Sequence, residues 1–321
     1  MRKENIYCYP KKDVANVVSM SDIAELLGVS CATVSRALNN SPKISAETKQ
    51  RVLQAAEKLG YLDKLAAKRQ QVVKKIGFII SKEYFGTHEL FYTRVLLGSE
   101  KRANKDNMRV NLFTFDEQES VEWLFGELKE FKIDGVIVAA VVSAKLLKRL
   151  LATGVKIVLV DFEHESLPVV EPDNFHGAYQ AVQHLYMRGR QQIAFVSGEQ
   201  DHPCMRQRYY GYRAAVEEGP GDFRPELAVL STGCCSVEDM ATGLMRAFQE
   251  KSIRIPEDVS VVGFDDLEMG VYTTPSLSTV RIHKERMGEI AAAMLVNWPL
   301  GWETPGWRVI VPTELVIRQS S

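Results

Sequence analysis

The 321-residue sequence contains no apolar run close to the roughly 20 residues of a membrane span, and its basic N-terminus lacks the apolar segment of a signal peptide. It is also poor in cysteine, with five residues that form no CxxC pair: Cys8, Cys31, Cys204, Cys234 and Cys235. An odd, scattered set of cysteines suggests neither a disulfide framework nor a zinc site. These absences predict a cytoplasmic protein without a bound metal.

Motifs of common enzyme classes are missing as well. The six histidines are scattered and form no HExxH motif, and the sequence has neither a GxSxG elbow nor a GxxxxGK[ST] loop. Isolated histidines are mostly structural or surface residues. We therefore expect no enzymatic activity and no cofactor.

The charge is nearly balanced overall but unevenly distributed. Residues 1–75 contain 14 Lys and Arg against 7 Asp and Glu, whereas the remaining chain contains 26 against 34, so the net charge of −1 is the sum of +7 and −8. A basic N-terminal part is suited to neutralising phosphates, and an acidic remainder is repelled by them. This asymmetry predicts that DNA contacts are confined to the N-terminal part.

Two short helices joined by a tight turn are indicated by residues 20–41, which read MSDIAELLGVSCATVSRALNNS. Apolar residues recur one turn apart in each helix, and Gly28 with Val29 supplies the turn. Ser30 is placed to cap the second helix. A third helix follows Ser45 as its N-cap and ends at Gly60. This pattern is typical of a helix-turn-helix DNA-binding head.

The same stretch resembles the head of the lactose/galactose repressor family of bacterial transcription regulators. The matching residues, in order, are Asp22, Ile23, Ala24, Gly28, Val29, Ser30, Ala32, Thr33, Val34, Ser35, Arg36, Leu38 and Asn39. The resemblance implies that Cys31 and Ala32 read bases and that Arg36, one turn on, can pair bidentately with guanine. Ser30, Thr33 and Ser35 are expected to bind phosphate. For Arg36, a surface ion pair is the alternative role.

The linker after the head departs from the family pattern. The family usually has Tyr-x-Pro-Asn followed by a hinge helix whose leucine wedges into the minor groove, but here Gln70 stands at the wedge position. Wedges are apolar because they replace base stacking, so we expect weaker DNA bending. Lys68 and Arg69 are expected to contact phosphate or, alternatively, to be solvated.

From residue 76 the sequence alternates short apolar runs with helical segments, beginning with IGFII, VNLFTF, DGVIVAAV and VKIVLVD. Such runs predict parallel strands covered by helices on both faces. A second series follows residue 174, which predicts two doubly wound α/β lobes with a ligand cleft at their strand ends. The resemblance implies the same fold, a two-lobed core like the periplasmic sugar-binding proteins.

These patterns divide the chain into a flexible extension (1–19), the head (20–62), a hinge (63–75) and the core (76–321). We expect the first lobe to span about 76–172 and 280–300, and the second lobe about 173–279 and 301–321. Compared with the family, the second lobe lacks one helix and one strand after residue 230, where STGCCSVEDMATGLMRAF runs on directly. Loss of an interior strand exposes the edges of its neighbours, so a blunted effector response is expected.

The resemblance also places effector contacts in the core, at Phe91, Tyr92, Asp173, Arg208 and Asp265. These residue types suit a polyol, because Asp accepts from hydroxyl groups and Arg donates in a fixed fork. Each position has a structural alternative. Phe91 and Tyr92 could belong to the helix core, Asp173 could cap a helix, Arg208 could form an ion pair, and Asp265 could sit in a strand-end turn.

The sequence thus predicts a homodimeric, sequence-specific repressor that binds a near-palindromic DNA operator and responds to a small molecule, most readily a sugar. Two alternatives remain open. The lobes alone resemble the sugar-binding module of a transport system, and the shortened second lobe is compatible with a truncated regulator that has lost its effector response.

Overall fold

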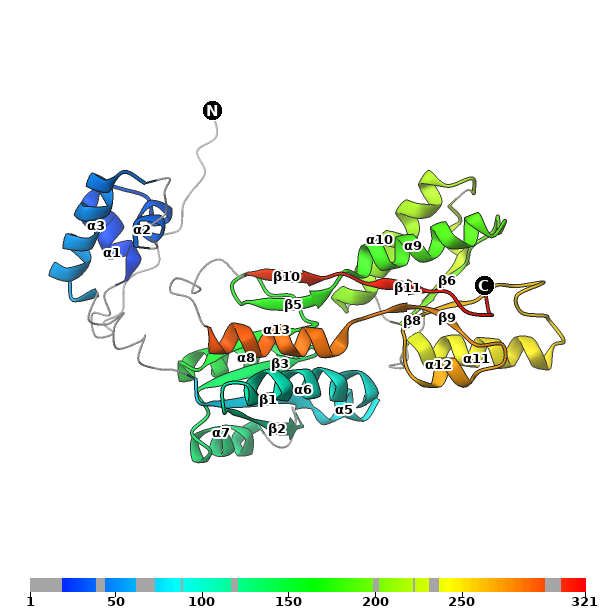
Figure 1. Ribbon diagram of the computed structural model, residues 1–321, viewed down its shortest axis with the longest axis horizontal. Helices are drawn as coiled ribbons and strands as arrows, with labels where there is room; N and C mark the ends of the chain where they lie inside the picture. Colours follow the sequence, from blue (N-terminus) through cyan, green and yellow to red (C-terminus); the bar gives the residue numbers. More distant parts are fainter. Residues whose placement is uncertain are drawn as a thin grey trace. The chain divides into compact units, whose positions relative to one another are not determined.

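The structure is a computed structural model that describes residues 19–38, 44–61, 73–87, 89–116, 121–198, 202–221, 223–230, 237–297 and 307–321. The chain divides into two units, Met1–Val72 with the head and Val73–Ser321 with the core (Figure 1). The predicted contacts at Lys68, Arg69 and Gln70 lie outside the described residues, as do positions 1–18 of the expected extension. None of the described helices combines the length and apolarity needed to cross a membrane.

The head consists of the three expected helices: α1 (Met20–Leu27), α2 (Cys31–Leu38) and α3 (Ala46–Lys58). Gly28 ends α1 in the left-handed region with a φ of 65°, a conformation that glycine adopts without steric cost. Ser45 caps α3, because its side chain accepts from the Thr48 N–H at 3.2 Å. Ile23, Val34 and Val52, one from each helix, are completely buried against one another. The predicted head is therefore confirmed.

The first lobe is built on one sheet whose pairs are all parallel, in the order β10-β5-β4-β3-β1-β2. Its strands are β1 (Lys75–Ser81), β2 (Arg109–Phe115), β3 (Gly135–Ala139), β4 (Lys156–Val160), β5 (Val169–Pro172) and β10 (Arg308–Val311). Its helices are α5 (Lys82–Thr87), α6 (Glu89–Asn104), α7 (Val121–Glu130), α8 (Ala144–Thr153) and α13 (Lys284–Val296). This arrangement confirms the predicted doubly wound fold.

Alternate residues of β1 point to opposite faces of this sheet, as its pleat requires. Phe78 packs in the cluster that contains Val95 of α6 and Met287 of α13. Its neighbour Ile79 packs instead in the cluster that contains Leu124 of α7. All five residues of β3 are buried, so the middle of the sheet is covered on both faces.

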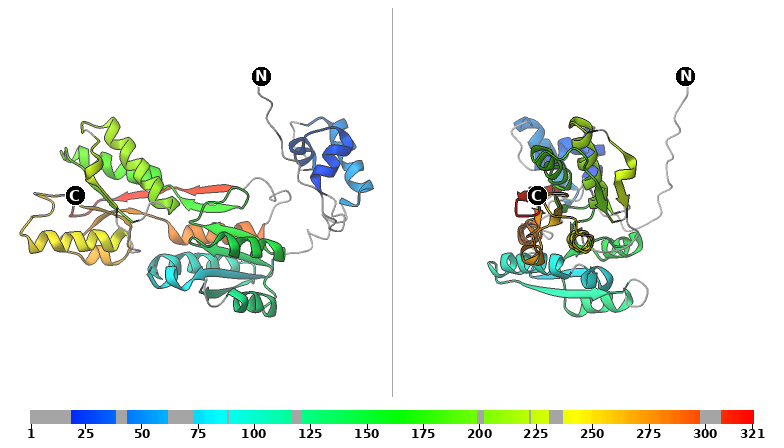
Figure 2. Two further views of the ribbon diagram at one scale, coloured as in Figure 1. Left: turned by 180° about the vertical axis from the view of Figure 1, so that it is seen from behind. Right: turned by 90° about the vertical axis from the view of Figure 1, so that its right-hand side faces the viewer.

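The second lobe contains two separate sheets, a parallel pair β6-β7 and a three-stranded sheet β11-β9-β8. Its strands are β6 (Phe195–Ser197), β7 (Ala228–Leu230), β8 (Val262–Asp265), β9 (Ser278–Arg281) and β11 (Glu314–Val316). Its helices are α9 (Asn174–Met187), α10 (Pro203–Glu218), the 3₁₀ turn η1 (Pro225–Leu227), α11 (Val237–Glu250) and α12 (Met269–Tyr272). Figures 1 and 2 show these elements at the end of the core that carries the C-terminus.

The two lobes share a plan except at one place. In the first lobe β1 and β2 are followed by α7, β3 and α8, and β3 pairs with both β1 and β4. In the second lobe β6 and β7 are followed by α11 and then β8, and within the described residues no strand joins β6 to β8. This break lies where the sequence comparison with the family places a missing helix and strand.

The chain passes between the lobes at three short connections. Asp173 joins β5 to α9, Ile282 and His283 join β9 to α13, and Pro312 with Thr313 joins β10 to β11. Two of these connections are tied together, because the Asp173 N–H donates to the Val311 carbonyl at 2.9 Å.

One expected boundary is corrected by the sheet pairing. The sequence predicts that residues 301–321 belong to the second lobe, but β10 pairs with β5 and therefore belongs to the first sheet. The stretch after β10 then reaches the second lobe, where β11 pairs with β9. The short VVEP segment of β5 lacks a long apolar run, so the sequence pattern does not predict it as a strand.

Candidate functional site

The candidate DNA-reading surface lies on α2 of the head. Ser30 caps this helix, since its Oγ accepts from the Thr33 N–H at 3.1 Å and lies 2.9 Å from the Thr33 hydroxyl oxygen. Val34 and Ala37 are buried against the other helices, which turns the intervening side chains outward. The amphipathic pattern of the sequence thus fixes which face of α2 is available to DNA.

The predicted DNA contacts occupy this outer face. Cys31, Ala32 and Arg36 are exposed, whereas Thr33 and Ser35 are half-buried. Within the described part of the head, Arg36 forms no ion pair, so its guanidinium is available to an outside acceptor. Cys31 lies close to the neighbouring helix, with its Sγ 3.8 Å from Ser21 Oγ.

The core holds a second candidate site at the junction of its lobes. A cavity of about 230 Å³ is lined by residues that follow β4, by β5 and β10 of the first lobe, and by the first turns of α9 and α10. Four carboxylates line it: Asp161, Glu163, Glu171 and Asp173. Arg308 forms ion pairs with Glu163 and Glu171, and burial raises the pKa of the Glu171 carboxyl despite that arginine.

Only one of the five predicted effector residues, Asp173, lines this cavity. Asp173 also caps α9, because its Oδ1 accepts from the His176 N–H at 3.1 Å. The structural alternative for this residue is therefore realised, while part of its carboxylate stays exposed beside the cavity. A cap and a ligand contact are compatible roles for one carboxylate, since it has several lone pairs.

Arg208 and Asp265 are brought together, deep in the core. The Arg208 Nη2 donates to Asp265 Oδ1 at 3.1 Å, its Nε donates to Asn174 Oδ1 at 2.8 Å, and the guanidinium lies 3.8 Å from the ring centre of Phe264. Both charged side chains are at least nine-tenths buried. The remaining nitrogen, Arg208 Nη1, is buried with no hydrogen-bond partner among the described residues. Such a donor is unusual in a folded protein and favours an added acceptor.

Phe91 and Tyr92 are mostly buried in α6 and meet edge to face at 5.0 Å. Both residues therefore belong to the helix core, which is the structural alternative to an effector contact, but both also contact polar groups. The Lys284 Nζ lies 5.6 Å from the ring centre of Phe91 and donates to the Asp265 carbonyl. The Tyr92 hydroxyl donates to Asp161 Oδ2 at 3.2 Å.

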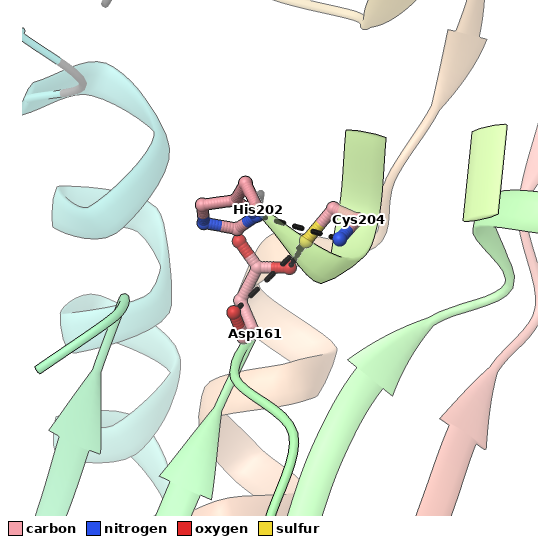
Figure 3. A group of neighbouring side chains, drawn as sticks. All are labelled: Asp161, His202 and Cys204. Atoms are coloured by element: carbon pink, nitrogen blue, oxygen red, sulfur yellow. Dashed lines mark hydrogen bonds between the residues drawn. The ribbon is translucent and has the colours of Figure 1, made fainter. Parts of the chain in front are cut away.

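Beside Tyr92 lies a cluster of three potential metal-binding side chains that the sequence did not reveal. Asp161 follows β4, and His202 and Cys204 stand at the start of α10 (Figure 3). The Cys204 thiol donates to Asp161 Oδ1 at 2.8 Å, and the Cys204 N–H donates to His202 Nδ1 at 3.3 Å. Burial, followed by the charge of Asp161, raises the pKa of the Cys204 thiol well above its usual value. The only sequence signal was Asp161 at the end of a strand.

Strained backbone marks the same region. Ala140, Asp161, Asp265 and Asp266 have φ between 52° and 98°, and they stand at the carboxyl ends of β3, β4 and β8. Residues other than glycine in this region cost energy and persist where the surroundings enforce them, commonly at ligand sites. In open parallel sheets, ligands bind at these strand ends. The backbone and the side chains thus point to one ligand-binding region.

A helix-turn-helix head joined to a two-lobed α/β core with a polar junction defines a DNA-binding regulator with a ligand-binding core. Sequence profiles agree with this class. Residues 19–63 match the bacterial regulatory proteins of the lacI family, residues 73–223 match the periplasmic binding proteins and sugar binding domain of the LacI family, and residues 182–321 match a periplasmic binding protein-like domain. The chain thus combines a lacI-family DNA-binding domain with a periplasmic-binding-like core, which confirms the resemblance found in the sequence.

Individual relatives extend along nearly the whole chain. The probable HTH-type transcriptional repressor ExuR of Bacillus subtilis is 28% identical over 334 aligned positions, covering 95% of this chain and 98% of the relative. That alignment is longer than the chain itself, so the relative contains residues that have no counterpart here. The HTH-type transcriptional repressor PurR of Vibrio atlanticus is 28% identical and covers 88% of this chain and 92% of the relative.

Solved structures show the same fold. The transcriptional regulator CelR in its cellobiose complex is 25% identical, covers 95% of this chain and 100% of its own, and superposes with a TM-score of 0.69. The lac repressor dimer bound to operator is 23% identical, covers 95% and 99% of the two chains, and has a TM-score of 0.66. These relatives are transcriptional regulators and not enzymes, and a DNA-binding regulator is what the sequence predicted.

Proposed function

We propose that the protein is a homodimeric repressor of the cytoplasm that binds a near-palindromic operator through Arg36 and its neighbours on α2, without enzymatic activity. The observation that carries this proposal is the exposed face of α2, where Arg36 is free of ion pairs within the described head. A small three-helix head reads only a few base pairs, so two heads on a two-fold axis supply the missing affinity and specificity. The repressor names of the full-length relatives support the direction of regulation.

Selection of bound duplexes from a random library, followed by gel shift at fixed salt, tests operator recognition. Arg36→Ala is expected to weaken binding by about 1 to 3 kcal/mol per contact and to relax the preference at one position of each half-site. Arg51→Ala on the exposed side of α3 is the matched control, because it removes the same charge away from α2. Equal losses for the two variants on specific and random DNA would show that Arg36 contacts phosphate only.

We further propose that a small hydroxylated molecule, a sugar by preference, binds between the lobes and changes operator affinity. The polar groups in this region suit hydroxyls, because Asp173 lines the cavity and accepts hydrogen bonds. Arg208 lies deeper in the core, and its Nη1 is a buried donor without a partner among the described residues. The structural relative with cellobiose bound and the matching sugar-binding profile support this chemistry. An effector acts only if it binds the two conformations of the regulator with different affinity.

Calorimetric titration with a panel of sugars, sugar phosphates and nucleobases identifies the ligand, and operator binding with and without the saturating compound measures its effect. Because the second lobe is divided into two sheets, we expect a blunted response: the effector should change operator affinity by less than tenfold, or about 1.4 kcal/mol of coupling. A larger change would show that the shortened lobe still closes on its ligand. Recovery of the protein from a periplasmic fraction would instead favour a transport module.

A further inference from the structure

We propose that Asp161, His202 and Cys204 form a binding site for a transition-metal ion of the Zn²⁺ class, which would tie the first lobe to the second. One ligand atom from each residue, a carboxylate oxygen, a ring nitrogen and the Sγ, lies within 4.8 Å of the other two. Asp161 comes from the first lobe, and His202 and Cys204 come from α10 of the second. This inference does not depend on the proposed DNA and sugar functions.

The donor set selects the class of metal. A thiolate, an imidazole and a carboxylate together suit Zn²⁺ and similar borderline ions, whereas Mg²⁺ and Ca²⁺ prefer oxygen ligands alone. Three protein ligands with a fourth position open to water is the arrangement of catalytic zinc sites, whereas structural zinc sites usually have four protein ligands. The ligand atoms lie within 4.8 Å of one another. Two ligands of a tetrahedral Zn²⁺ ion are about 3.5 Å apart, at bond lengths of about 2.0 to 2.3 Å, so binding requires the three side chains to move closer together.

The surroundings of the cluster resemble those of a metal site. Asp161 and Cys204 are buried, and Figure 3 shows the Asp161 carboxylate and the Cys204 Sγ turned toward each other beneath the His202 ring. The Tyr92 hydroxyl holds Asp161 Oδ2, which leaves Oδ1 directed at Sγ. A hydrogen bond of this kind orients a metal-binding carboxylate. The positive φ of Asp161, 61°, fixes its backbone in an uncommon conformation at the same point.

Proton balance is simple. In the metal-free protein the Cys204 S–H donates to Asp161. When a divalent ion binds, the thiol loses that proton to solvent, and the sulfur electron pair and a carboxylate oxygen are both directed to the ion. One proton is therefore released for each ion bound, and affinity rises with pH. No oxidant or reductant takes part.

Cobalt(II) is the probe for the test, because a cobalt–thiolate bond gives a charge-transfer absorption in the near ultraviolet. The full-length protein, reduced and freed of metal, is titrated with Co²⁺ and then with Zn²⁺ as competitor. We expect stoichiometric binding with the charge-transfer band, displacement by Zn²⁺, and a thermal unfolding midpoint that rises with Zn²⁺ concentration. Absence of the band would overturn the proposal.

Variants locate the site. Cys204→Ser is expected to abolish the band and to weaken Co²⁺ binding at least tenfold, whereas Cys31→Ser, at the exposed cysteine of the head, is expected to leave both unchanged. If Cys204→Ser folds poorly, His202→Gln, at a half-buried position, is the second variant and is expected to weaken binding at least tenfold. An unchanged band in folded Cys204→Ser would assign the metal to other cysteines and refute the site. All these readouts are independent of DNA, so loss of operator binding would not affect them.

Discussion

In the first lobe β3 lies between β1 and β4 and is buried along its whole length, whereas in the second lobe no described strand lies between β6 and β8. Strand β7 of the second lobe is less protected than β3. Val229 and Leu230 of β7 are about half exposed, at 54% and 47%. The difference shows that β8, with Asp265 at its carboxyl end, forms its sheet although no described strand connects it to β6. Stability should therefore be unequal, with the first lobe as the rigid partner.

The largest expected effect tests the core of the first lobe. Phe78→Ala in β1 removes a completely buried ring and is expected to lower the free energy of unfolding by about 3 to 5 kcal/mol. Val229→Ala in β7 is the counterpart in the second lobe, and its half-exposed side chain should contribute less than about 0.5 kcal/mol. Urea unfolding of both variants measures this difference. Similar losses would mean that the two sheets are equally well packed.

The next largest effect is expected at the buried ion pair between Arg208 and Asp265 in the second lobe. Arg208→Ala leaves Asp265 as a buried charge without its partner and is expected to destabilise the protein by about 3 kcal/mol. Arg206→Ala is a control two residues away, because Arg206 is partly exposed and its ion pair with Glu163 should be worth less than about 1 kcal/mol. If Arg208→Ala proves harmless, the second lobe is loose enough to admit water around Asp265.

Gly→Ala substitutions are expected to change the free energy of unfolding in opposite directions in the two lobes. A Cβ on Gly288 would lie 1.9 Å from the Val95 carbonyl oxygen, where α13 crosses α6, so Gly288→Ala should cost about 1 to 3 kcal/mol. Among the described residues, a Cβ on Gly243 of α11 meets no atom within 4 Å, so Gly243→Ala should stabilise its helix by about 0.5 to 1 kcal/mol. Thermal unfolding measures both effects, with a lower midpoint expected for Gly288→Ala and a higher one for Gly243→Ala. A destabilising Gly243→Ala would indicate that α11 packs closely against a surface outside the described residues.

The smallest expected effect is a pH dependence in the second lobe. Burial, and then the nearby charge of Arg188, lowers the pKa of His184, whose Nε2 lies 2.9 Å from the Ser321 hydroxyl oxygen. The folded protein therefore binds this proton more weakly than the unfolded chain. Neutral His184 therefore favours the folded protein. This contribution to stability is fully present above pH 6.5, the ordinary pKa of histidine, and is lost as the pH falls through 6.5 toward the lower pKa of the folded protein.

Unfolding midpoints of the parent and of His184→Gln between pH 8 and pH 5 check this sign, with the pH range set around the ordinary histidine pKa of about 6.5. The variant should lose less stability over this range than the parent. His283→Gln, at an exposed position, should follow the parent. A parent whose stability rises as the pH falls would contradict the lowered pKa.

The sequence predicted the parts of this protein that are specified by local patterns. The head follows from apolar spacing, from the caps at Ser30 and Ser45 and from Gly28, and the strands of the first lobe follow from their apolar runs. The absent strand was also detectable, because the resemblance provided a complete pattern for comparison.

Other features depend on contacts between distant residues and could not be predicted. β10 was assigned to the wrong lobe because only its pairing with β5 defines its sheet. Asp161 and Cys204 are 43 positions apart in sequence, so their contact depends on how β4 and α10 meet. For the same reason, the low cysteine content suggested no metal site, although three suitable donors converge in space.

The three connections between the lobes have a mechanical consequence. Each is only one or two residues long, and two of them are joined by the hydrogen bond from Asp173 to Val311. Short links set side by side resist twisting and sliding, yet they permit bending about the line on which they lie, and Pro312 stiffens one of them further. The core is thus left with one soft degree of freedom, so ligands of different shape would drive the same motion and differ only in how far they drive it.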